Sequence, residues 1–241
     1  DATIATIEFG HPASNSFPAQ LLHDLTKTIE TLGQNPEVAV LVLKSQGTAA
    51  FCAGASLDEL LDVTNEAEGK AFFSGFAYLI NAMRKCPKLI IGRVQGKTVG
   101  GGVGITAACD YVLATQEANI KLSELAIGIG PFVIEPAVSR KIGKTALAEL
   151  SLTAQEWKSA AWAKEKGLYA NTFESIEKLD QAVTELAHRL ATYNPEAVTA
   201  MKKVLWEGTE HWDTLLLERA AITGKLVLSE VTKTALEAFK K

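Results

Sequence analysis

Residues 97–110 read Lys97-Thr98-Val99-Gly100-Gly101-Gly102-Val103-Gly104-Ile105-Thr106-Ala107-Ala108-Cys109-Asp110, and the rest of the chain is interpreted from this stretch. An apolar run over residues 89–94 precedes it and predicts a buried strand. Four glycines within five positions then break the strand, and small apolar residues follow at helical spacing. Because the first N–H groups of a helix are free and carry partial positive charge, this turn predicts a backbone site for an oxygen that is, or becomes, negative.

Three interpretations of the glycine turn stay open at this point. Tight helix–strand packing explains one or two glycines, but less well three in a row and a fourth. Residues 102–107 fit the dinucleotide pattern G-x-G-x-x-A, but residues 95–99 separate them from their strand, whereas the fingerprint directly follows one. The G-K-[ST] ending of a phosphate-binding P-loop is missing. The third interpretation is an oxyanion hole, which needs a second N–H donor from elsewhere in the chain.

A second turn of small residues supplies a candidate for that donor. Residues 38–43 are apolar on both faces, which is typical of a central parallel strand covered by helices on each side. Together with an alternating strand at 3–9 and an amphipathic helix ending at Gly33, they predict a βαβ unit. The small residues between 47 and 56 follow this strand. Loops at the carboxyl ends of parallel strands meet, so we expect the two turns to lie together.

The remaining elements are predicted from periodicity, caps and breakers. Thr153-Ala154-Gln155-Glu156 has the spacing of a capping box and predicts a helix start, with Gly167 as its end. Glu124 stands alone in an irregular apolar loop, and Gly224 is expected to be a weak point inside a long terminal helix. Helices are expected at 70–84, 153–167, 174–193, 197–206 and 212–239, and further strands at 110–115, 120–122 and 168–170.

Composition limits the function classes. The 241 residues with 47% hydrophobic content predict one domain, or one domain with an appendage, and the net charge of −4 gives no electrostatic footprint for nucleic acid. No apolar run reaches membrane-spanning length and no signal peptide opens the sequence, so we expect no membrane partner and a cytoplasmic location. The three cysteines lack metal-ligand spacing and are interpreted as reduced thiols, and the four scattered histidines as surface residues, so no metal site is expected.

Several segments resemble the crotonase (enoyl-CoA hydratase/isomerase) superfamily in order and spacing over nearly the whole chain. The matching segments are Asn15-Ser16-Phe17, Phe51-Cys52-Ala53-Gly54-Ala55, Val94 to Gly102, Cys109-Asp110, Ser123 to Gly128 and Thr153 to Gly167. The resemblance implies an α/β fold built as a spiral of ββα units over residues 1–193. It also implies a C-terminal helical region, residues 194–241, for oligomerisation by subunit packing, in a homotrimer or homohexamer.

The resemblance implies a coenzyme A thioester substrate, as in fatty acid metabolism, with coenzyme A entering as part of the substrate and no separate cofactor. By position, the thioester carbonyl lies between the backbone N–H groups of Ala55 and Gly101, which form the oxyanion hole. Walls of the acyl pocket are expected from residues 64–78 and from Phe132 onward. The implied substrate-binding residues are Ala53, Gly54, Gly102, Gly104, Pro131 and Phe132.

The acid–base residues decide the reaction. Hydratases of the superfamily use two glutamates; one of these positions is Gly104 here, and the other is Glu124. Moving a double bond needs a single base, and burial in an apolar loop is expected to raise the pKa of Glu124 towards neutrality. The pattern is therefore similar to Δ3,Δ2-enoyl-CoA isomerases, with Glu124 as the catalytic residue.

Several alternatives to that reaction stay open: an enoyl-CoA hydratase in which Glu124 acts alone, thioester hydrolysis or decarboxylation, a non-catalytic acyl-CoA-binding protein, and a nucleotide-dependent oxidoreductase. Glu135 has two interpretations. Beside Pro136 it is expected to be a helix-start residue favoured by the helix dipole. The sharper interpretation is a second acid–base group that replaces the one lost at Gly104. Lys240 and Lys241 are candidates for the coenzyme phosphates, although solvated tail lysines are the simpler interpretation.

Overall fold

A five-stranded parallel sheet forms the centre of the molecule. The computed structural model describes residues 3–240. Its strands lie in the order β1-β2-β3-β5-β7, and each pairs in parallel with its neighbour. Their bounds are β1 (Ile4–Phe9), β2 (Val40–Ser45), β3 (Leu89–Val94), β5 (Tyr111–Thr115) and β7 (Asn171–Phe173).

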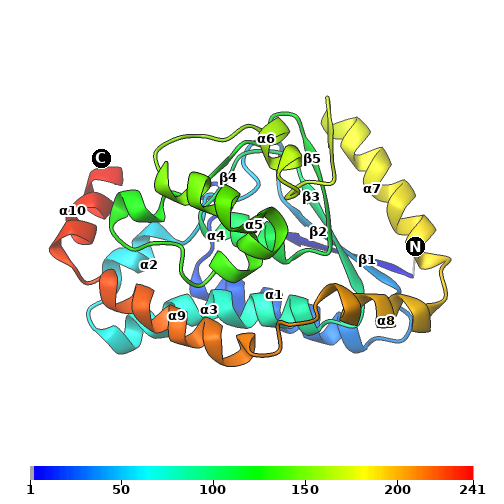
Figure 1. The fold of residues 1–241 in the computed structure, drawn as a ribbon, viewed down its shortest axis with the longest axis horizontal. Coiled ribbons are helices and arrows are strands. Elements are labelled where there is room, and N and C mark those ends of the chain that lie inside the picture. The colour runs from blue at the N-terminus through cyan, green and yellow to red at the C-terminus, as the bar shows by residue number, and fades with distance from the viewer. Residues whose placement is uncertain (1–2, 241) are drawn as a thin grey trace.

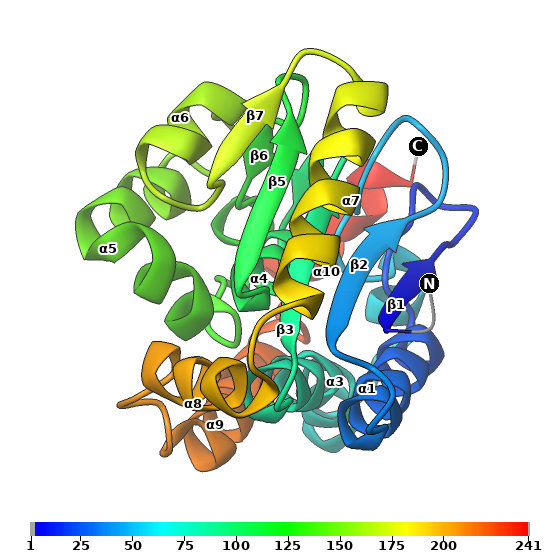
Figure 2. The ribbon, with the colours of Figure 1, turned by 90° about the vertical axis from the view of Figure 1, so that its right-hand side faces the viewer.

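Helices cover both faces of this sheet, as the two-sided apolar pattern of β2 predicts. Figure 2 shows α7 (Ile176–Ala191) crossing one face. Val40 and Val42 pack there against Leu179 and Val183 of α7. On the other face, Leu41 and Leu43 belong to the larger core with residues of α1 (Ala19–Gln34) and α3 (Glu66–Lys85). The predicted βαβ unit β1–α1–β2 is confirmed.

A small second sheet holds the two predicted turns against each other. It consists of β4 (Thr98–Val99) and β6 (Ile120–Lys121), which pair in parallel, and Cys52 forms a bridge to Thr98. The Val99 N–H donates to the Cys52 carbonyl (2.9 Å), and the Gly100 N–H donates to the Lys121 carbonyl (2.9 Å). The glycine turn then enters α4 (Gly101–Ala108), as its sequence predicts.

The C-terminal helices fold back onto the core of the same chain. They are α8 (Pro195–Leu205), α9 (Trp212–Leu226) and α10 (Glu230–Phe239). Figure 1 shows α9 running beside α3, and α10 at the end of the molecule near α2 (Leu57–Asp62). Trp206, Trp212, Leu216 and Leu236 belong to the same hydrophobic core as the strands. Packing of residues 194–241 against neighbouring subunits stays a prediction.

Three predicted boundaries are wrong, and each has a local cause. Thr153 does not start a helix: it follows α5 (Glu135–Leu152), and its hydroxyl donates to the Glu149 carbonyl (2.7 Å). The next helix, α6 (Ala160–Glu165), begins instead where the Ser159 hydroxyl accepts the Trp162 N–H (3.0 Å). The predicted end at Gly167 is confirmed, with φ of +92°.

The other two corrections concern residues 168–170 and 212–239. The extended segment lies at β7, three residues later than predicted, because the buried Tyr169 turns inward and its hydroxyl donates to the Ala118 carbonyl (2.8 Å). The long terminal helix breaks after Leu226 rather than at Gly224, and Ser229 caps α10 by accepting the Thr232 N–H (3.2 Å). Within the described part of the chain, no helix has both the length and the apolarity that a membrane crossing requires.

Candidate active site

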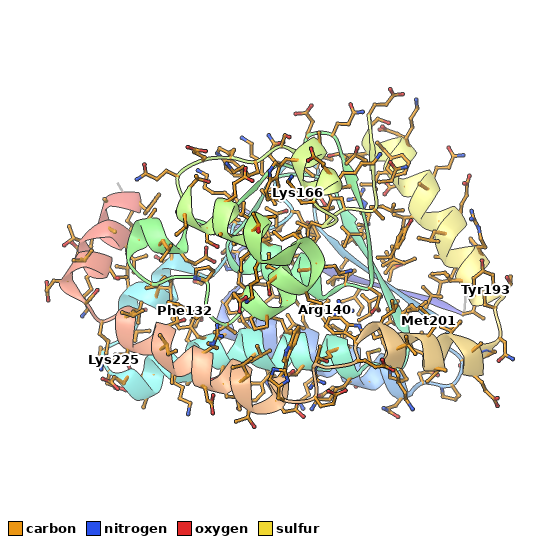
Figure 3. All side chains as sticks on the ribbon, in the orientation of Figure 1. Phe132, Arg140, Lys166, Tyr193, Met201 and Lys225 are labelled. Atoms are coloured by element: carbon orange, nitrogen blue, oxygen red, sulfur yellow. The ribbon has the colours of Figure 1, made fainter. Side chains whose placement is uncertain are left out.

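A pocket of about 440 Å³ lies where the two turns meet. Its wall combines the loop at 53–58, the glycine turn at 99–101, the connection from Ser123 to Ile134, and side chains of α3 and α10. Phe132, labelled in Figure 3, lies in the connection between η1 (Glu124–Ile127) and α5 and lines this pocket. The two turns, which the sequence predicts to meet, therefore share one cavity with α10, which was predicted to pack against other subunits.

The backbone around Ala55 directs one N–H group away from its own strand partner. The Phe17 N–H donates to the Gly54 carbonyl (2.8 Å), and the Ser56 N–H donates to the Phe17 carbonyl (2.9 Å). Since these bonds flank residue 55 in a parallel bridge, its own N–H points to the opposite side. Within residues 3–240, the Ala55 N–H donates no hydrogen bond.

Gly101 presents a second free amide next to this loop. It is the first residue of α4, where a backbone N–H has no partner inside the helix. It also donates no hydrogen bond to any other described residue. A Cβ built on Gly54 would lie 3.2 Å from the Val99 carbonyl oxygen and 3.9 Å from the Gly101 nitrogen. With φ of +94°, Gly54 allows the two loops to approach this closely.

Glu124 supplies a buried carboxyl group to the pocket. Its Oε2 is buried and has no hydrogen-bond partner among the described residues. A Cβ on Gly100 would lie 2.9 Å from Glu124 Oε1, so the carboxyl group lies against the bare backbone of the glycine turn. Burial raises the pKa of Glu124 to about 7. A carboxyl group that titrates near neutral pH can accept or donate a proton under ordinary conditions.

The structure separates the predicted substrate-binding residues into two groups. Ala53, Gly54, Pro131 and Phe132 line the pocket together with Ala55, Gly101 and Glu124. Gly102 and Gly104 are not among the residues that line it, and a substrate-binding role for them stays a prediction. Both face the packed interior: a Cβ on Gly102 would lie 2.7 Å from Cys52 Cβ, and one on Gly104 would lie 2.4 Å from Ile134 Cβ. These two glycines allow close packing of α4.

Glu135 is not among the residues that line the pocket. It begins α5, and its carboxylate accepts hydrogen bonds from Lys144 and from Arg219 (3.3 Å). Although burial opposes ionisation, the Lys144 and Ser139 hydrogen bonds and the charges of Lys144 and Arg219 hold its pKa below the ordinary value. These contacts fit the helix-start interpretation of Glu135, and its role as a second acid–base group stays a prediction.

Some polar residues of the pocket differ from what the sequence predicts. His11 and Ser16 line it, with His11 Nδ1 3.2 Å from the Ser16 hydroxyl, so His11 is not a plain surface residue. The only sequence signal was the neighbouring Asn15-Ser16-Phe17 segment. Lys240 forms an exposed ion pair with Asp58 (3.1 Å), and Lys241 lies outside the described residues.

The pocket also contains residues that the sequence analysis assigned to subunit packing. Thr223 of α9, together with Leu236 and Phe239 of α10, line the cavity of their own chain. Phe73 and Phe76 of α3 lie in the segment expected to form walls. Amphipathic spacing shows that a helix has an apolar face, but not which cavity that face closes. Between residues 3 and 240, no group of three or more His, Cys, Asp or Glu side chains could hold a metal ion.

Comparison with known proteins agrees with the family resemblance seen in the sequence. The sequence model of the family described as enoyl-CoA hydratase/isomerase matches residues 1–239. The chain is 27% identical over 226 residues to a peroxisomal Delta(3,5)-Delta(2,4)-dienoyl-CoA isomerase of Arabidopsis thaliana, covering 87% of this chain and 80% of that protein. It is 28% identical over 242 residues to a short-chain-enoyl-CoA hydratase of Clostridium acetobutylicum, covering 99% of this chain and 92% of that protein.

Solved structures resemble the whole chain. A crystal structure of an enoyl-CoA hydratase from Mycobacterium avium is 26% identical with a TM-score of 0.87, and the match covers 99% of this chain and 91% of that one. An enoyl-CoA hydratase from Bacillus halodurans, 21% identical, has a TM-score of 0.91 with 99% and 97% covered and shows the fold alone. The predicted crotonase-like α/β fold is confirmed. The chain therefore belongs to the enoyl-CoA hydratase/isomerase family of enzymes, which act on acyl-CoA thioesters.

Proposed function

We propose that this enzyme moves a carbon–carbon double bond within an acyl-CoA thioester, from the Δ3 to the Δ2 position, with Glu124 as its single acid–base group. One observation carries the proposal: among residues 3–240, Glu124 Oε2 is buried without a hydrogen-bond partner in the pocket that also contains two backbone amides without acceptors, those of Ala55 and Gly101. Asp58 also lines this pocket, but its side chain is exposed and paired with Lys240.

The chemistry follows from these three groups. Glu124 takes a proton from Cα of a 3-enoyl thioester, and the electron pair of that C–H bond moves into the thioester carbonyl as a dienolate. The N–H groups of Ala55 and Gly101 stabilise the negative oxygen, and one such donor contributes about 10²- to 10³-fold in rate. The protonated Glu124 then returns its proton to Cγ, which leaves the double bond between Cα and Cβ. No atom enters or leaves the substrate.

The raised pKa of Glu124 supports this double role. With a pKa of about 7, the carboxylate is a stronger base than an ordinary glutamate, and the carboxylic acid still releases its proton readily. The similarity to a named hydratase favours water addition by Glu124 alone as the second candidate. A coenzyme A-binding protein without turnover is a further outcome of the experiment below.

The decisive experiment compares two substrates and two glutamates. Purified wild type is assayed with a trans-3-enoyl-CoA and with crotonyl-CoA, next to Glu124→Gln and the control Glu135→Gln, which removes a carboxylate that does not line the pocket. We expect isomerisation to exceed hydration in the wild type. Loss of general acid–base catalysis should lower kcat of Glu124→Gln about 10²- to 10⁴-fold, while Glu135→Gln stays close to wild type.

Undiminished turnover by Glu124→Gln would contradict the proposed base. Faster hydration than isomerisation by the wild type would favour the hydratase, and coenzyme A binding without any turnover would favour the binding protein. We also propose a homotrimer or homohexamer located in the cytoplasm. Exposed apolar side chains on and beside α8, among them Tyr193, Met201 and Val204, support the assembly (Figure 3 labels the first two). Light scattering that gives the mass of one chain would contradict it.

A further inference from the structure

The direction of the Ala55 N–H group is set by the peptide that it shares with Gly54. In a planar trans peptide, the carbonyl and the N–H point in opposite directions. The Phe17 N–H donates to the Gly54 carbonyl (2.8 Å), so this hydrogen bond fixes one side of the peptide and thereby aims the Ala55 N–H on the other side. Gly54 has no side chain and a φ of +94°, so the glycine itself resists rotation of this peptide only weakly.

Phe17 belongs to a short segment, residues 14–17, that pairs with the same turn. At the other end of this segment, the Ser14 carbonyl accepts the Ala53 N–H (3.1 Å). The segment begins with two consecutive residues of positive φ, Ser14 at +53° and Asn15 at +57°. Residues that carry a side chain rarely adopt this conformation, and it persists only where surrounding contacts enforce it. The contacts that hold segment 14–17 therefore also decide where Phe17 lies.

The side chain of Asn15 holds this segment through both its amide nitrogen and its amide oxygen. Its Nδ2 donates to the carbonyls of Gln46 (2.8 Å) and Ala50 (3.0 Å), in the connection that follows β2. Its Oδ1 accepts the His11 N–H (3.1 Å), and its own backbone N–H donates to the His11 carbonyl (2.9 Å). Asn15 is only 7% exposed and is not among the residues that line the pocket. Asparagine tolerates a positive φ better than most residues, so its backbone and its amide both suit this position.

We propose that Asn15 is a positioning residue of the oxyanion hole: it holds Phe17 in the place from which Phe17 aims the Ala55 N–H at the thioester oxygen. This inference rests on one part of the proposed function, the use of that N–H to stabilise a negative oxygen. It does not depend on whether the enzyme isomerises or hydrates, because the thioester oxygen becomes negative in both reactions. Removal of the Asn15 side chain should therefore weaken stabilisation of the transition state more than it weakens binding of the substrate.

The first test compares Asn15→Gly with wild type and with Asn81→Ala. Glycine keeps the positive φ accessible and removes only the amide. Asn81 is a matched control, because it is equally buried (7%), donates to the Trp212 carbonyl (3.3 Å) and is not among the residues that line the active-site pocket. We expect kcat of Asn15→Gly to fall about 10²-fold with KM little changed, because a donor misplaced by about 1 Å no longer meets the developing charge. Asn81→Ala should lower the melting temperature and leave kcat at the wild-type value.

A spectroscopic measurement tests the same hydrogen bonds without turnover. Butyryl-CoA, isotope-labelled at its carbonyl carbon, is bound to each protein, and the carbonyl stretch is recorded by infrared difference spectroscopy. Hydrogen bonds to the oxygen weaken the C=O bond, so the band should lie below its aqueous position in the wild type and in Asn81→Ala. In Asn15→Gly it should return towards that position. Asn15→Asp is the second variant: it keeps an acceptor for the His11 N–H but turns an oxygen towards two carbonyls, so it should behave like Asn15→Gly.

The outcomes separate this inference from the proposed function. Folded Asn15→Gly and Asn15→Asp enzymes with the wild-type kcat and the wild-type band overturn the role of Asn15 and leave the function intact. An equal loss of kcat in Asn81→Ala indicates general destabilisation and overturns that role as well. A wild type that hydrates faster than it isomerises overturns the isomerase, whereas a lowered band that reverses in Asn15→Gly still supports Asn15. A wild-type band at its aqueous position overturns the oxyanion hole, and this inference with it.

Discussion

At the scale of single residues, the raised pKa of Glu124 accompanies a buried carboxyl oxygen that has no hydrogen-bond partner among the described residues. Its Oε2 has no hydrogen-bond partner in the described chain, and its Oε1 lies against Gly100, whose φ of +54° and lack of a side chain leave room for it. The unpaired Oε2 and the burial of Glu124 separate it from Glu135, whose carboxylate is held ionised by Lys144 and Arg219. The pKa values of two glutamates 11 positions apart in the sequence are therefore shifted in opposite directions.

The raised pKa of Glu124 predicts a pH dependence of the rate. The proposed base must be ionised in the free enzyme, so kcat/KM should rise with pH, pass its midpoint near the pKa of about 7, and level off above it. A pH–rate profile with a 3-enoyl-CoA measures this midpoint. A midpoint near 4.5, the ordinary value, would show that Glu124 is hydrated rather than buried.

Stability gives an independent check on the same group. A carboxyl whose pKa is raised on folding contributes stability below its unfolded pKa, and this contribution is lost as the pH rises through the folded pKa. Thermal unfolding should therefore show that Glu124→Gln gains stability relative to wild type between pH 5 and pH 8. A constant difference over this range would contradict the raised pKa.

At the scale of elements, the crossing of α3 and α9 depends on two glycines. A Cβ on Gly224 would lie 2.4 Å from the backbone nitrogen of Lys70, and one on Gly69 would lie 2.4 Å from the Gly224 carbonyl oxygen. Both obstacles are backbone atoms, so no side-chain rotation relieves them. A glycine in a helix interior is unfavourable when considered alone, so the sequence predicts a weak point of the helix at Gly224. In the structure, the close contact with α3 requires a glycine at this position.

Gly224→Ala tests this interpretation by the sign of its effect. Helix propensity alone would stabilise the variant by about 1 kcal/mol. Because the helices must instead separate, we expect a loss of about 1–3 kcal/mol in the free energy of unfolding, measured by urea denaturation. A more stable variant would show that the two helices do not cross as closely as described.

At the scale of the whole molecule, a buried ion pair joins the C-terminal helices to the sheet. Lys202 of α8 donates to Asp110 Oδ2 (2.6 Å) and to the carbonyls of Met83 (2.9 Å) and Lys88 (3.3 Å). Asp110 also accepts hydrogen bonds from the Ile90 N–H (2.8 Å) and the Trp206 indole (2.7 Å). This network connects α8 to the ends of α3 and α4 and to the start of β3.

Lys202→Met should leave the Asp110 carboxylate buried without its counter-charge. We expect a loss of about 3–5 kcal/mol in the free energy of unfolding. The double variant Lys202→Met/Asp110→Asn removes the uncompensated charge and should lose less than the single variant. Chemical denaturation of both proteins measures the difference, and equal losses would show that the charge of Asp110 contributes little.

At this scale too, local sequence patterns predict part of the structure, whereas contacts between segments distant in sequence are not predicted. The two-sided apolar run of β2, the glycine turn into α4 and the isolated Glu124 are local patterns with direct structural meaning, and each appears in the structure as expected. The contact of Gly104 with Ile134 joins residues 30 positions apart and has no local signal. The closure of the pocket by Leu236 is of the same kind, because periodicity identifies an apolar face but not its partner.

The free amides of Ala55 and Gly101 belong to the main chain, whereas the carboxyl group of Glu124 belongs to a side chain. Amino-acid substitutions affect these two kinds of group differently. A single nucleotide change can replace a glutamate codon, but no codon change other than one to proline deletes a peptide N–H. The two peptide N–H groups should therefore persist through more substitutions than the carboxyl group, but only where position 101 stays glycine, because a Cβ there would lie 2.3 Å from Phe76 Cε1.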